Sequence, residues 1–101
     1  MITVTASEYG IKAVGHAGYA PIGQDIVCAA FTILMSTLAE HIECNSDLLI
    51  EYKIDIKPGY AEINCVPKNE YRMEIKGIFD VIDTGINILL NEYPKNVEKI
   101  L

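Results

Sequence analysis

The chain has 101 residues, a length that suits one domain with one core and is too short for two. Half of the residues are hydrophobic and 22% are charged, which is the composition of a globular protein and not of a disordered one. The formal net charge is −6 and the eight basic residues are scattered, which argues against nucleic-acid binding and suits a basic protein partner. No basic segment followed by an apolar run opens the sequence, so we expect no secretory signal. The longest apolar stretch, residues 26–38, is interrupted by Thr32, Ser36 and Thr37, so we expect no membrane span.

The three cysteines, Cys28, Cys44 and Cys65, form no CxxC motif, and an odd number cannot all pair within the chain. Without an export signal, we expect reduced thiols in the cytoplasm. His41 and Cys44 are close in sequence, but their spacing matches no standard zinc motif. We therefore expect no metal site and no cofactor.

The first half of the chain predicts two strands and a helix. Residues 2–6 alternate between apolar and polar side chains, which indicates a half-buried strand, and Gly10 marks a turn. Residues 11–17 predict its hairpin partner, with His16 near the end and on the same face as Lys12 and Val14. A loop follows, and Asp25 is a favourable N-cap for a helix over residues 26–44. The loop has a glycine at each end and spans six residues: Gly18, Tyr19, Ala20, Pro21, Ile22 and Gly23.

The second half predicts a hairpin and a second helix. Residues 50–57 and 61–65 alternate around a turn in which Pro58 and Gly59 hold the second and third positions, as a type II turn requires. From about residue 69, apolar side chains recur at three- and four-residue steps until Pro94, which indicates an amphipathic helix. Residues 97–101 are long enough to add a short final strand. The expected fold is a single α+β domain over residues 1–101, with two layers, a mostly antiparallel sheet, two helices and the order β-β-α-β-β-α.

Two segments suggest chemistry. With Asp25 as the N-cap, Cys28 is the third residue of the first helix, where free backbone N–H groups and the helix dipole favour an anionic thiolate. His16 lies at the end of the strand before the loop, so its imidazole can reach the same helix end and serve as a base for the thiol. The same N–H groups could stabilise an oxyanion. The alternatives are that Cys28 is a small buried hydrophobic residue, that His16 is a strand-end histidine and that Asp25 is only a helix cap.

The stretch from Gly15-His16-Ala17 through the glycine-bounded loop to the run GQDIVCAA at residues 23–30 resembles the signature of the ribosomal-processing cysteine protease Prp family. Chain length, element order and the Tyr93-Pro94 pair extend the resemblance over the whole sequence. The resemblance implies that His16 and Cys28 are a catalytic dyad and that Asp25 supports activity or orders the site. One departure is Phe31-Thr32, where family members commonly carry a small residue and Ser; Thr32 keeps the hydroxyl.

The resemblance also implies a function. Family members remove a short N-terminal extension from a large-subunit ribosomal protein, and phage-encoded members process virion proteins. The expected partner is therefore a protein substrate with an N-terminal extension, which the Cys28 thiol attacks. The loop from Gly18 to Gly23 is expected to act as a mobile cover over the bound substrate. The alternatives are a non-catalytic module that binds an extended peptide during ribosome or capsid assembly, and a thiol redox sensor that needs no histidine.

The family also implies a homodimer, and the first helix gives an independent reason to expect one. Its polar side chains occupy one narrow arc at 100° per residue, and most of its remaining circumference is apolar. Such a helix must be covered on more than one side, and a second subunit can supply that cover. The alternative is that the second helix and a loop suffice.

Overall fold

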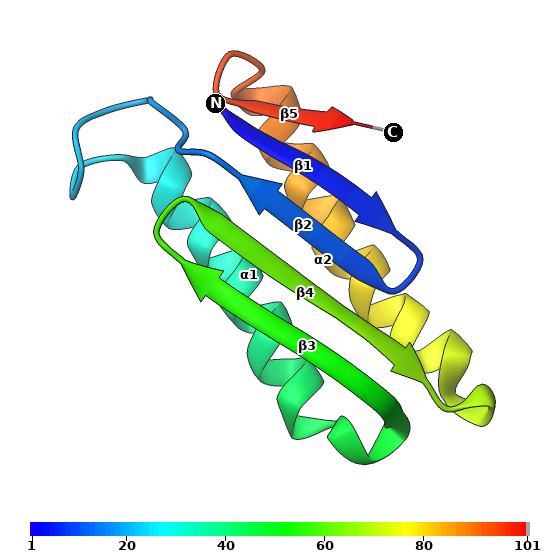
Figure 1. Ribbon diagram of the computed structural model, residues 1–101. Helices are drawn as coiled ribbons and strands as arrows, with labels where there is room; N and C mark the ends of the chain where they lie inside the picture. Colours follow the sequence, from blue (N-terminus) through cyan, green and yellow to red (C-terminus); the bar gives the residue numbers. More distant parts are fainter. Residues whose placement is uncertain (101) are drawn as a thin grey trace.

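In the computed structural model, which describes residues 1–100, two helices pack on one face of a five-stranded sheet (Figure 1). The elements in chain order are β1 (Ile2–Ser7), β2 (Gly10–Val14), α1 (Ile26–Cys44), β3 (Leu49–Lys57), β4 (Tyr60–Pro67), α2 (Arg72–Glu92) and β5 (Val97–Ile100). Short 3₁₀ turns, Ser46–Leu48 and Asn69–Tyr71, precede β3 and α2. This is the expected two-layer α+β architecture.

The sheet has the strand order β3-β4-β2-β1-β5. The two hairpins, β1–β2 and β3–β4, are antiparallel and are joined to each other by the antiparallel pair β2–β4. The final strand β5 pairs with β1 in parallel, so the sheet is mixed but mostly antiparallel. Gly59 has a φ of 73°, the left-handed value that the third position of a type II turn requires. The predicted strand over residues 97–101 is thus present as Val97–Ile100, and Leu101 lies outside the described residues.

The core lies between the sheet and the helices. Val4, Ile63 and Val97 from the sheet are fully buried, as are Ile42 of α1 and Ile86 of α2. By length and by a mean hydropathy of 1.4, α1 could cross a membrane. One face of α1 is instead buried in this core, which accounts for its apolar composition. The helix also extends beyond the apolar stretch of residues 26–38.

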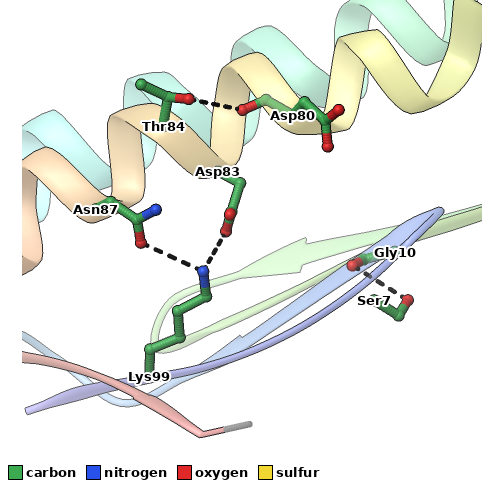
Figure 2. A network of polar contacts seen from close by, with 7 residues as sticks. All are labelled: Ser7, Gly10, Asp80, Asp83, Thr84, Asn87 and Lys99. Carbon is green, nitrogen blue, oxygen red and sulfur yellow. Dashed lines mark hydrogen bonds and ion pairs between the residues drawn. The ribbon is translucent and has the colours of Figure 1, made fainter.

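A half-buried ion pair fastens the last strand to the helix layer. Lys99 of β5 points towards α2, where its Nζ lies 2.7 Å from Asp83 Oδ1 and donates to Asn87 Oδ1 at 3.2 Å (Figure 2). The Asp83 side chain is only 33% exposed, so this pair is less screened by water than a surface pair. It holds β5 against the second half of α2.

Candidate active site

Cys28 sits in the first turn of α1, as the sequence predicts. Asp25 caps the helix with extended φ and ψ values of −85° and 101°, and α1 begins at Ile26. The thiol is half-buried, and the Ala17 N–H donates to its Sγ at 3.3 Å. The segment before the loop and the helix after it therefore meet at the sulfur of Cys28.

Two of the N–H groups in the first turn of α1 are already taken by the N-cap side chain. The Asp25 carboxylate accepts from Val27 N at 3.0 Å and from Cys28 N at 2.9 Å, both through Oδ1. The capping carboxylate of Asp25 competes with an oxyanion for these two N–H groups, so their role in stabilising an oxyanion stays a prediction. The Ala17 N–H is the donor that the structure places beside the sulfur.

His16 reaches the site because β2 ends earlier than expected. The predicted strand runs to residue 17, but β2 ends at Val14, and Gly15 adopts a φ of 107°. Gly15 donates its N–H to the Gly59 carbonyl at 2.9 Å, and a Cβ at position 15 would clash with the Met1 carbonyl oxygen. Only glycine fits there. The kink breaks the alternation that placed His16 on the same face as Lys12 and Val14.

The imidazole of His16 instead lies over the β3–β4 turn. A Cβ built on Gly59 would come within 2.8 Å of His16 Nε2, so the ring is in direct contact with this glycine. The sequence identified Pro58 and Gly59 as a turn but gave no sign that the turn supports the histidine. Only the pairing of β2 with β4 brings the two together.

His16 and Cys28 line one pocket of about 360 Å³. Phe31, Thr32 and Met35 of α1 form one wall, and Ile56 to Ala61 of the β3–β4 hairpin form another. In the part of the chain that the structure describes, the side chains of His16 and Cys28 are not hydrogen-bonded to each other. A base and a nucleophile on two separate elements can face each other in this way before a substrate draws them together. The lining of the pocket is mostly apolar, so the pocket can accept apolar side chains of a ligand.

Asp25 joins the loop to the helix. Its Oδ2 accepts from Tyr19 N at 2.9 Å and from Ala20 N at 3.2 Å, while Oδ1 caps α1. Partial burial acts to raise the pKa of Asp25, but the hydrogen bonds from Cys28, Ala20, Tyr19 and Val27 outweigh it and hold the pKa below its ordinary value. Asp25 is therefore a charged link between the two segments that carry the site.

The loop itself is anchored at its start and exposed at its tip. The ring of Tyr19 packs edge-on against Tyr93 with 5.5 Å between centroids, while the side chain of Ile22 is fully exposed. Gly18 and Gly23 have φ values of 69° and 88°, and neither has an atom within 4 Å of an added Cβ. The role of this loop as a mobile cover stays a prediction.

The other cysteines are in different surroundings. Cys65 faces the core and is 8% exposed, and burial raises the pKa of its thiol to about 11. Cys44 is exposed at the end of α1, with its Sγ 4.0 Å from Glu40 Oε1. Across residues 1–100 no cluster of His, Cys, Asp and Glu could hold a metal ion.

Comparisons with known proteins agree with this architecture. The crystal structure of the ribosomal processing protease Prp from S. aureus with a covalently linked product peptide is similar, with a TM-score of 0.78 and 23% identity over 98% of this chain and 97% of that one. SMU.848 from Streptococcus mutans matches with a TM-score of 0.69 and 25% identity, over 97% and 89%. The S. aureus protease with a substrate peptide matches with a TM-score of 0.69 and 18% identity, over 98% and 95%.

A comparison with curated proteins found no match. The family model described as cysteine protease Prp, however, matches residues 1–98, which is nearly the whole chain. The resemblance first noted in the residues around His16 and Cys28 is thereby confirmed: this chain belongs to the Prp family of cysteine proteases.

Proposed function

We propose that this chain removes a short N-terminal extension from a large-subunit ribosomal protein, or from a virion protein if the chain is of phage origin. The observation that carries the proposal is that His16 and Cys28 line one pocket. The S. aureus protein of the same fold is a ribosomal processing protease solved with a substrate and with a product peptide, which supports a peptide ligand here.

In the proposed mechanism His16 takes the proton of the Cys28 thiol, and the sulfur attacks the carbonyl carbon of the scissile peptide bond. The C–N bond breaks, His16 returns the proton to the leaving amine, and a thioester remains on Cys28. Water, deprotonated by His16, then hydrolyses the thioester and regenerates the thiol. The Ala17 N–H, already beside the sulfur, can donate to the oxyanion that forms at each attack.

The edge strand β3 supports an extended substrate. Tyr52 and Ile56 face the helix layer, as do their partners on β4, Cys65 and Ala61. The β4 residues are buried, whereas Tyr52 and Ile56 remain 41% and 42% exposed beside the free edge of the sheet. An extended peptide could pair with this edge and place alternate apolar side chains towards Ile56 and the pocket.

The direct experiment is incubation with candidate proteins that carry short N-terminal extensions, followed by intact mass measurement. Cys28→Ala and His16→Ala should each abolish cleavage. The chain offers a matched control pair, Cys44→Ala and His41→Ala, because both residues are exposed at the end of α1. Binding without any change in mass would favour the non-catalytic peptide-binding module. Cleavage by Cys28→Ala would overturn the mechanism.

We further propose that the protein acts as a homodimer in the cytoplasm. Three free thiols suit a reducing compartment. The outer side of the helix layer carries four exposed apolar side chains: Ile26 and Ile33 on α1, 56% and 63% exposed, and Val81 and Ile88 on α2, 71% and 57% exposed. Covering this outer helix patch with a second copy would bury apolar surface that one chain leaves in water.

A further inference from the structure

Asn96 follows Ala17 by 79 residues, yet its side chain contacts Ala17, the residue next to His16. Its Nδ2 donates to the Ala17 carbonyl oxygen at 3.0 Å. Because a carbonyl oxygen only accepts, the nitrogen end of the amide must be the end that faces it. The backbone of Asn96 is also held: its N–H donates to the Tyr93 carbonyl and its carbonyl accepts from Ile2 N, both at 2.9 Å. Asn96 is thus fixed between the end of α2 and β1.

Ala17 is the residue whose N–H points at the nucleophile. The residue packs in the core with 2% exposure, its carbonyl accepts from Asn96, and its N–H donates to Cys28 Sγ at 3.3 Å. Three separate contacts therefore define the orientation of this one residue. The nearby helix N–H groups of Val27 and Cys28 are taken by Asp25, which leaves the Ala17 N–H as the donor beside the sulfur.

We infer that Asn96 is a positioning residue for the Cys28 nucleophile, acting through Ala17. The side-chain amide holds the Ala17 carbonyl, and this contact keeps the Ala17 N–H directed at the sulfur. A hydrogen bond to the charged form of a group favours that form, so the contact favours the thiolate that attacks. The inference rests on the proposed role of Cys28 as the nucleophile. It gives the turn between α2 and β5 a role in the site, although this turn lies far from Cys28 in sequence.

The test compares Asn96→Ala with Asn91→Ala, a control that deletes an exposed amide near the end of α2. Neither substitution adds a charge. A changed pH profile of Cys28 alkylation therefore reports the lost hydrogen bond to Ala17 and not a change in the electrostatic field at the thiol. The readout is the rate of alkylation of Cys28 by iodoacetamide across the titration range of the thiol, resolved by peptide mass spectrometry. We expect Asn96→Ala to move the midpoint of this profile upwards and to slow alkylation about tenfold at pH values below the wild-type midpoint. Asn91→Ala should keep the wild-type profile.

A second variant, Asn96→Ser, retains a shorter donor and should have a midpoint between those of wild type and Asn96→Ala. Thermal unfolding establishes which variants are folded, and if Asn96→Ala is not, Asn96→Ser alone decides. A wild-type alkylation profile in the folded variants would overturn the inference. Alkylation needs no peptide substrate, so a failure to cleave ribosomal or virion proteins would count against the proposed function and not against this role of Asn96.

Discussion

The three cysteines of the chain differ in what surrounds each sulfur. Cys28 is half-buried with an N–H donor beside it, Cys44 is exposed next to Glu40, and Cys65 is in the core. Because the pKa of Cys65 is raised to about 11, at neutral pH it holds about a hundredfold less thiolate than a thiol of ordinary pKa. Limited alkylation with site-resolved mass spectrometry should label Cys28 first and Cys65 last. Faster labelling of Cys44 or Cys65 than of Cys28 would contradict this assignment.

Asp25 should contribute to the stability of the fold only above acid pH. Its pKa is lower in the folded protein than its ordinary value of 3.8, so its stabilising effect is complete above that value. The effect is lost as the pH falls through the lower folded value. Asp25→Asn can still cap α1 through its oxygen, but its NH₂ group would face the N–H donors of Tyr19 and Ala20.

We therefore expect Asp25→Asn to lower the unfolding temperature at neutral pH and to approach wild type as the pH falls below 3.8. Cleavage should fall on the order of 10-fold to 100-fold, because the loop and the helix end lose their link. Thermal scans over a pH series measure the first effect, with the exposed Asp47→Asn as the control. A stability difference that is independent of pH would show that the charge of Asp25 is not what matters.

At the scale of the elements, the β3–β4 turn should control the position of His16. Gly59→Ala places a Cβ 2.8 Å from His16 Nε2 and also forces alanine to a φ of 73°. Gly23→Ala carries the same kind of strain at a φ of 88° with no atom in reach, so it is the matched control for stability. Each should lose roughly 1–2 kcal/mol of unfolding free energy from the strain.

Only Gly59→Ala should displace the imidazole. The NMR resonances of the His16 ring, followed through a pH titration, should move in Gly59→Ala and stay in place in Gly23→Ala. Peptide cleavage should fall in Gly59→Ala by more than its stability loss explains. If the His16 resonances of Gly59→Ala are those of wild type, the turn does not support the histidine.

For the whole molecule, the outer helix patch gives a prediction about assembly. Ile33→Glu puts a charge at the patch and should shift a dimer towards monomers of 11.2 kDa in sedimentation experiments, because a buried unpaired carboxylate is costly. Met73→Glu is the control, since Met73 is 88% exposed at the start of α2 and is not part of the patch. A wild-type monomer at tens of micromolar, or a dimer insensitive to Ile33→Glu, would contradict the proposed interface.

The sequence by itself determined the features that depend on neighbouring residues. Asp25 and the apolar run after it placed α1 at residues 26–44 because capping and helical period are local. The Pro58-Gly59 pair placed the β3–β4 turn because φ preferences belong to single residues. The GHA and DIVC segments identified His16 and Cys28 as the dyad to test.

Only the tertiary structure decided which distant residues meet. The strand order placed Gly59 under the His16 ring, and the parallel pairing of β5 with β1 brought Asn96 to the Ala17 carbonyl. The tertiary structure also ended β2 at Val14, because Gly15 bends the chain where it passes close to the Met1 carbonyl. In addition, it left apolar side chains of the edge strand β3 exposed to solvent. These contacts join residues far apart in the chain, so they follow from the packing of whole elements and leave no periodic signal in the sequence.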